Sequence, residues 1–308
     1  MRRGGILTQA RERLYFPGIS MDELQHPSDR KALSALRKVR GLDVITRKMI
    51  EWGLEGKIRK ELMANCLRVS EKQCPSLYGL YRDCTRTLGV EDPPEFFVEC
   101  NPHPSSYIVG VTKAMVVLST GLIDVMDEGE LRFVLGHMLG HHLCQHVLYQ
   151  TMARYISQIL DLVARTTLGL GGLVGKPLEV ALMSWSRVSE FSADRAGLLA
   201  CQDLDTALRA LIKLGVPSRK LWSEINIEEL LRQAAELEPE FEVEVPPEGR
   251  LAKLKGKLGQ LKEKLSKLTI GTRAQPWPVL RIRELVKWAR SGEYEAILAR
   301  GEPLEPLG

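Results

Sequence analysis

The deciding stretch of this sequence reads Leu135-Gly136-His137-Met138-Leu139-Gly140-His141-His142-Leu143-Cys144-Gln145-His146, and it holds four of the chain's six histidines. At 3.6 residues per turn, His137 and His141 point from one helix face, with Cβ atoms about 5 to 6 Å apart. Two imidazoles at that spacing can reach one zinc ion at about 2.0 to 2.1 Å. The alternative interpretation is an incidental pair of histidines on a helix that binds no metal. His142 and His146 fall on other faces, so we expect them to be solvated or locally hydrogen-bonded.

A zinc site with one open position needs a third protein ligand. A histidine six residues after His141 would supply it in one known pattern, but Val147 stands there. The better candidate is Glu190, on a second helical stretch that runs from about Pro177 to Cys201. Asp194 follows one turn later on the same face, where it could orient an imidazole by accepting its free N–H.

The rest of the sequence contains further segments with helical spacing and several short β-like runs. Apolar residues recur at helical spacing over 28–60, and a long helical pattern continues from Leu131 through Val147. Runs rich in Val, Ile, Tyr or Phe at 96–100, 106–110 and 115–119 predict a small antiparallel sheet. The expected fold class is therefore α+β and mainly α, with two long zinc-bearing helices.

The order of several segments resembles the HtpX and CaaX-prenyl-protease type of gluzincin, a class of zinc metallopeptidases, and particularly its small soluble relatives, the minigluzincins. The resemblance covers roughly Cys66 to Leu214, and Pro276 to Tyr294 resembles the family's C-terminal segment. The segments that carry it are Tyr107-Ile108-Val109-Gly110, Val117-Leu118-Ser119-Thr120-Gly121-Leu122, Glu128 to Leu131, the histidine helix and Glu190 to Asp194.

The resemblance implies a zinc metalloendopeptidase with roles for particular residues. His137, His141 and Glu190 would be the zinc ligands, and Asp194 would be the carboxylate behind them. The strand Tyr107, Ile108, Val109 and Gly110 would be the sheet edge that pairs with an extended peptide or an unfolded protein segment.

Met138 departs from the family pattern at the position of greatest chemical consequence. The family has a glutamate there, which acts as general base toward the attacking water, and a thioether cannot accept that proton. A second departure is Gln275, where relatives often have a histidine, whereas Arg281 remains as a candidate oxyanion donor. We therefore expect an enzyme that is inactive or strongly impaired as written.

Two interpretations of Met138 stay open. The chain is either a natural pseudopeptidase, acting as a zinc-stabilised peptide-binding or membrane-surface regulatory module, or an otherwise working peptidase in which an inactivating change was made. Activity in a Met138→Glu variant, with none in the chain as written, would favour a lost base. Gln275, as a second departure, inclines the interpretation toward natural degeneration.

Composition and patterning suggest an organisation in three parts: an N-terminal helical segment over 1–65, a metallopeptidase core over 66–222, and a C-terminal part over 223–308. The last part would comprise an acidic linker, a basic leucine-striped helix at 250–268 and a helical segment packed on the core. That basic helix either packs on its own domain or makes peripheral contact with a membrane or a partner.

Bulk properties exclude some partners and suggest a compartment. The 43 Lys and Arg against 39 Asp and Glu leave a formal net charge of +4, which is too slight to predict a nucleic-acid partner. Six scattered cysteines without a CxxC pair are typical of reduced thiols. The N-terminus shows no apolar secretion signal, so we expect a cytoplasmic protein. Peripheral contact with a membrane is compatible with this expectation.

Overall fold

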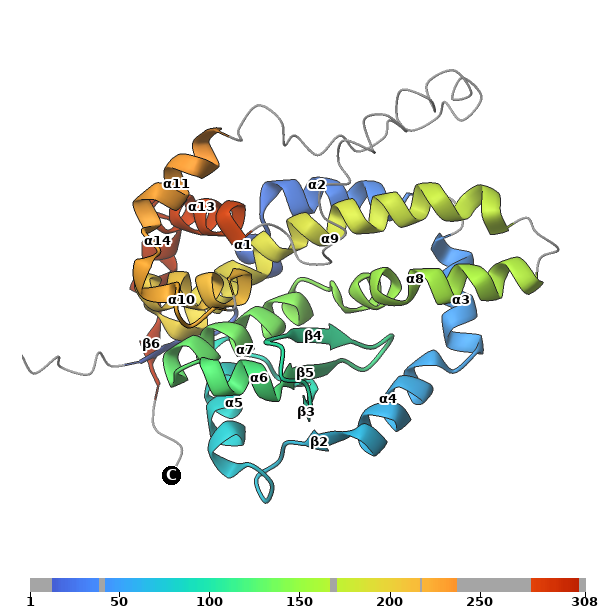
Figure 1. Cartoon of the computed structure of the whole chain (residues 1–308), viewed down its shortest axis with the longest axis horizontal. Helices are drawn as coiled ribbons and strands as arrows, with labels where there is room; N and C mark the ends of the chain where they lie inside the picture. Colours follow the sequence, from blue (N-terminus) through green and yellow to red (C-terminus); the bar gives the residue numbers. More distant parts are fainter. Residues whose placement is uncertain (1–12, 39–41, 167–170, 217, 237–277, 305–308) are drawn as a thin grey trace, which may run out of the picture.

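The computed structural model describes residues 13–38, 42–166, 171–216, 218–236 and 278–304. Helices dominate, and they surround one small sheet (Figure 1). The α+β, mainly α fold class is thereby confirmed. None of the helices in the described ranges combines the length and the apolar character that a membrane crossing requires. The segments at 250–268 and Gln275 lie outside the described residues.

The helices follow the chain in an order that places two long ones at the centre. Their bounds are α1 Met21–Leu24, α2 Pro27–Leu36, α3 Leu42–Glu51, α4 Leu54–Asn65, α5 Pro75–Thr87, α6 Thr120–Val125, α7 Glu128–Leu143, α8 Val147–Thr166, α9 Gly171–Cys201, α10 Leu204–Gly215, α11 Ile227–Glu236, α13 Pro278–Ala289 and α14 Glu293–Ala299. A separate short pair joins β1 Leu14–Tyr15 to β6 Glu302–Pro303 near the two ends of the described chain.

Within the described residues, four strands form a mixed sheet in the order β2-β3-β5-β4, with bounds β2 Cys66–Arg68, β3 Glu95–Glu99, β4 Ser106–Val109 and β5 Met115–Ser119. The expectation of a purely antiparallel sheet is wrong, because β3 and β5 pair in parallel. All five residues of β5 are buried, whereas Ser106 and Tyr107 of β4 are only partly so. The more apolar strand of the β4–β5 hairpin therefore takes the interior place, and β4 becomes the edge.

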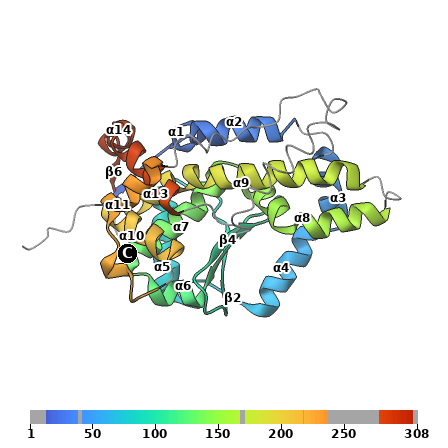
Figure 2. The same cartoon turned by 45° about the horizontal axis from the view of Figure 1, so that its top comes forward.

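Helices cover both faces of this sheet. On one face, Phe96 and Val116 pack into the main core with residues of α5 and α7. On the other face, Phe97 and Val117 pack against Ile58 of α4. Figure 2 shows the sheet lying between α7 and α4. The sheet is thus a rigid support beneath the histidine-bearing helix.

The histidine-bearing helix begins and ends at well-formed caps. Asp127 and Glu130 form a capping box at its start. At its end, the His146 N–H donates to the His141 carbonyl and the Gln145 N–H donates to the His142 carbonyl, which is a Schellman arrangement. Gln145 takes the left-handed conformation, with φ of 59°, that this ending requires. The expectation of one helix continuing through Val147 is therefore wrong, and α8 starts there instead.

Small residues let α7 and α9 approach each other closely. A Cβ placed on Gly136 would lie 2.2 Å from the Cβ of Ala200, and one placed on Gly140 would lie 2.7 Å from the Cβ of Ala196. Both separations are far below a van der Waals contact, so the two helices can adopt this spacing only with glycine at these positions. This contact sets the distance between the histidines of α7 and Glu190 of α9.

We expect Gly136→Ala to lower the free energy of unfolding by about 1–3 kcal/mol, because overpacking forces the two helices apart. The matched control is Gly79→Ala in α5, where an added Cβ meets nothing within 4 Å. That variant should gain about 0.5–1 kcal/mol from its better helix propensity. Chemical denaturation measures both, and equal stability changes in the two variants would contradict the role of the close contact.

The helix α9 is packed against both α2, near the start of the chain, and α13, near its end. Leu33 and Leu36 of α2 share a core with Leu182 and Trp185 of α9. The helix α13 also packs along α9 and brings Arg281 into the interior. Segments at the two ends of the sequence thus meet the same helix that carries Glu190.

Candidate functional site

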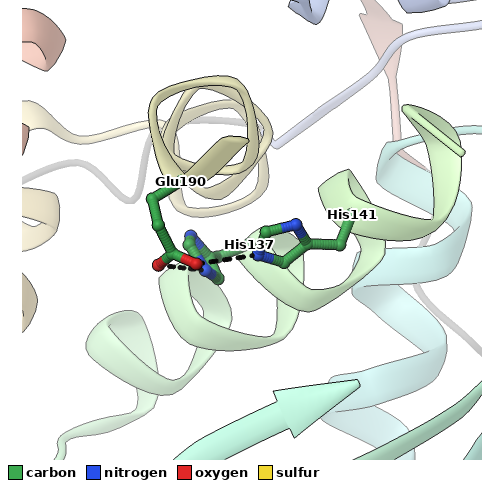
Figure 3. Close-up of side chains that lie close together, drawn as sticks. All are labelled: His137, His141 and Glu190. Carbon is green, nitrogen blue, oxygen red and sulfur yellow. Dashed lines mark ion pairs between the residues drawn. The ribbon is translucent and has the colours of Figure 1, made fainter. Parts of the chain in front are cut away.

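The structure brings His137, His141 and Glu190 together from two helices. The Nε2 atom of His137 lies 3.5 Å from one Glu190 carboxylate oxygen, and the Nε2 atom of His141 lies 3.4 Å from the other. Figure 3 shows both imidazoles on α7, with the carboxylate reaching from α9 toward them. The two rings are nearly perpendicular, and their centroids are 4.8 Å apart.

This arrangement fits a metal ion. One potential ligand atom from each residue lies within 4.8 Å of the other two, and all three residues are shielded from solvent. Two imidazole nitrogens and one carboxylate are one of the donor sets found in catalytic zinc sites, where a fourth position is left open. Among the described residues, this is the one His, Cys, Asp and Glu cluster with such geometry.

Asp194, predicted to accept the free N–H of an imidazole, contacts His137. Its Oδ1 atom lies 2.8 Å from the Nδ1 atom of His137. An ionised carboxylate only accepts hydrogen bonds, so the His137 proton belongs on Nδ1 and its Nε2 lone pair is left for a ligand. Asp194 is almost fully buried and therefore needs a countercharge.

Arg281 supplies that countercharge to both carboxylates. Its Nε and Nη2 atoms donate to Asp194 at 2.8 and 2.5 Å, and its Nη1 atom lies 3.3 Å from Glu190. Only 3% of Arg281 is exposed. The guanidinium is thus already occupied by carboxylates, which favours a supporting role. The oxyanion-donor role stays a prediction.

The charges of this cluster perturb the protonation of its members. Burial alone would raise the pKa of Glu190, but the Arg281 guanidinium and the two histidines hold that pKa well below its usual value. Burial lowers the pKa of His141 to about 4, so this ring is neutral at pH 7. An ionised Glu190 beside a neutral His141 is the protonation state in which these side chains bind a metal.

Met138 occupies α7 between the two histidines and is buried, with 3% of its surface exposed. Its side chain belongs to the main hydrophobic core. Among the described residues, the carboxylates that contact His137 and His141 are Glu190 and Asp194. Both are committed to the ligand cluster and to Arg281, so neither stands ready to act as a base in place of residue 138.

The predicted substrate strand forms the edge of the sheet, as expected. Its end beyond Val109 is closed, because Thr151 of α8 accepts from the Gly110 N–H at 2.9 Å and lies 2.8 Å from the Gly110 carbonyl. Arg154 of α8 covers the Tyr107 ring at 3.6 Å from its centroid. Pairing by an added strand is therefore open only along the preceding part of β4.

Two residues that sequence patterns missed complete the surroundings of His141. His146, expected to be solvated or locally hydrogen-bonded, is fully buried, and its Nδ1 atom lies within hydrogen-bonding distance, 3.1 Å, of the Nδ1 atom of His141. Asp29 of α2 is fully buried and lies 3.0 Å from the other nitrogen of His146. The expectation of one continuous helix placed His146 on a face away from His141, whereas α7 ends before it.

Cys144 belongs to the hydrophobic core. None of its surface is exposed, and burial raises the pKa of its thiol. A thiol held protonated in this way is a poor nucleophile. All six cysteines are free.

Comparison with known proteins agrees with this geometry. The chain is 29% identical over 289 residues to the plastoglobule-localized metallopeptidase 48, chloroplastic, of Arabidopsis thaliana, covering 93% of this chain and 78% of the relative. It is 27% identical over 172 residues to a protease HtpX homolog of Polynucleobacter necessarius and 28% identical over 176 residues to protease HtpX homolog 2 of Methanosarcina mazei. Each of these two matches covers 49% of this chain and 59% of the relative.

No solved structure matches the chain. The model of peptidase family M48 matches residues 71–289, which include the histidine helix, Glu190, Asp194 and Arg281. This stretch is more than two thirds of the chain. The chain belongs to peptidase family M48, a family of metallopeptidases.

Proposed function

We propose that this chain is a zinc-binding, minigluzincin-like member of the family whose peptide-hydrolysing activity is absent or strongly impaired as written. The observation that carries the proposal is the combination of an intact His137, His141 and Glu190 cluster with a buried methionine at residue 138. Metal binding and general-base catalysis are separate requirements, and the chain meets the first without the second.

In this proposal each residue around the cluster has a defined task. His137 and His141 would hold zinc through Nε2, and Glu190 would hold it through a carboxylate oxygen. Zinc bound there supplies Lewis-acid polarisation of the scissile carbonyl. Asp194 keeps the His137 proton on Nδ1, and Arg281 keeps both carboxylates ionised. Met138 can neither take a proton from water nor pass one to a leaving amine.

The proposed substrate is an extended peptide or an unfolded protein segment. Its backbone would add to the free edge of β4 along Ser106 to Ile108, which would fix position through main-chain hydrogen bonds and leave sequence preference weak. The closed end at Gly110 limits how far such a peptide can pair.

Elemental analysis of the purified chain should find about one zinc per molecule, a stoichiometry expected of a three-ligand site. Glu190→Gln should lose most of that zinc, because a neutral amide is a weaker ligand than a carboxylate. Glu71→Gln, an exposed change of the same kind, is the matched control and should keep it. Equal zinc in both variants, or none in the unmodified chain, would overturn the site assignment.

A second candidate function is a pseudopeptidase that binds peptides or a membrane surface without turnover. The contacts that support the metal cluster are complete although residue 138 is incompetent, which favours a retained binding role. Fluorescence anisotropy should then report binding of a labelled unfolded peptide that remains uncut. A peptide that fails to bind would count against this function.

The membrane version of this function rests on 250–268, which lies outside the described residues. A cytoplasmic protein with peripheral membrane contact would co-sediment with anionic vesicles through this basic segment. We expect deletion of 250–268 to abolish that co-sedimentation. Unchanged co-sedimentation would exclude the segment as the contact.

A further inference from the structure

A line of buried polar side chains connects His141 to the N-terminal helix α2. The Nδ1 atoms of His141 and His146 are 3.1 Å apart, and the Nε2 atom of His146 lies 3.0 Å from the Oδ2 atom of Asp29. His146 and Asp29 are fully buried, and His141 is 2% exposed. Water is therefore excluded from the whole line, and each nitrogen must find its partner within it.

The direction of the protons along this line follows from the place of the metal cluster. The Nε2 atom of His141 faces Glu190 at 3.4 Å, and a nitrogen that binds a metal must carry a lone pair. The His141 proton then belongs on Nδ1, from which it is donated to Nδ1 of His146. His146 must in turn carry its own proton on Nε2, the atom that faces Asp29.

We propose that His146 and Asp29 are positioning residues, which hold His141 in the tautomer and orientation that leave its Nε2 atom free to bind the metal. This inference rests on the proposed zinc site. The contact between His146 and Asp29 lies at ion-pair distance without the alignment of a regular hydrogen bond. The carboxylate charge nevertheless favours a proton on the nitrogen that faces it. His137 and Asp194 form the equivalent arrangement for the other histidine.

The other partners of Asp29 determine which of its oxygens faces His146. The Trp185 indole N–H donates to Oδ1 at 2.9 Å, and the Ser192 hydroxyl donates to Oδ2 at 2.6 Å. An indole N–H can only donate, so an asparagine here must place its carbonyl oxygen toward Trp185. Its amide NH₂ then faces His146, where it donates to Nε2 and demands the opposite tautomer of both histidines.

We expect Asp29→Asn and His146→Phe each to weaken zinc binding by about 10- to 100-fold, the usual range for groups behind a metal ligand. Competition with a chromogenic zinc chelator measures this in the full-length chain. Because both changes break the same line, the double variant should bind zinc no more weakly than the weaker single variant. Trp288→Phe is the matched control, since it removes an indole N–H that donates to a carboxylate, Glu293, outside the line, and its zinc affinity should stay within about threefold.

The tautomer of His146 gives a second readout that needs no zinc. Nitrogen-15 NMR of the metal-free protein should show the His146 proton on Nε2, the atom that faces Asp29, in the unmodified chain and on Nδ1 in Asp29→Asn. A purely structural role of Asp29 would leave this tautomer unchanged and make the losses in the double variant additive, and either result would overturn the inference. If the unmodified chain binds no zinc, the proposed function fails, and the tautomer measurement still decides this inference.

Discussion

Met138→Glu should raise the rate of casein cleavage by about 10²- to 10⁴-fold over the chain as written, the usual contribution of a general acid–base group. Residue 138 follows His137 directly on α7 and is shielded from solvent. A glutamate there could take a proton from the attacking water and return it to the leaving amine. Initial rates on fluorescein-labelled casein, with zinc content measured in parallel, test the expectation.

The matched control for this gain is Met138→Gln, which has the size and shape of glutamate but cannot accept the proton. It should stay as inactive as the unmodified chain. Adding Glu190→Gln to Met138→Glu should abolish the gain, because the metal is lost. If Met138→Glu binds zinc, folds and still cleaves nothing, the lost base is not the main defect, and a pseudopeptidase that only binds peptides becomes the better interpretation.

Arg281→Gln should lower the free energy of unfolding of the metal-free chain by about 3–5 kcal/mol, the usual cost of removing one partner from a buried ion pair. The guanidinium faces two carboxylates that burial would otherwise neutralise, Asp194 at 2.5 Å and Glu190 at 3.3 Å. Without it the pKa values of both would rise toward protonation, so zinc affinity should fall as well. Urea denaturation with and without zinc measures both effects.

The matched control for Arg281→Gln is Arg59→Gln, which breaks an exposed pair with Glu95. Such surface pairs contribute about 0–1 kcal/mol. Arg281→Lys should recover only part of the loss, because an ammonium cannot reproduce the two-pronged contact with Asp194. A change below about 1 kcal/mol in Arg281→Gln would show that the two carboxylates are neutral or otherwise compensated in the folded chain.

Local sequence determined much of the candidate site. The four-residue spacing of His137 and His141 sets both imidazoles on one helix face, and the same spacing in α9 sets Asp194 one turn from Glu190. Resemblance to a known family then linked the two helices. The short β-rich runs also predicted the strands, since alternation and β-branched residues act within a few positions.

Tertiary structure alone decided the rest. The parallel pairing of β3 and β5 depends on which hairpin strand is buried, and it overturned the antiparallel expectation. Arg281 contacts Asp194 from 87 residues away along the chain, and Asp29 contacts His146 from still farther away. Helical and strand periodicity act within a few residues and cannot predict such contacts.

His146 shows the physical reason most clearly. On a continuous helix it would point away from His141, because five residues correspond to about 140° of rotation. The left-handed Gln145 ends α7 and turns the chain back, so the ring of His146 folds under the preceding turn and meets His141. The sequence by itself determined which residues could bind a metal, and the tertiary structure decided which buried partners hold them, since those contacts depend on chain reversals and long-range packing.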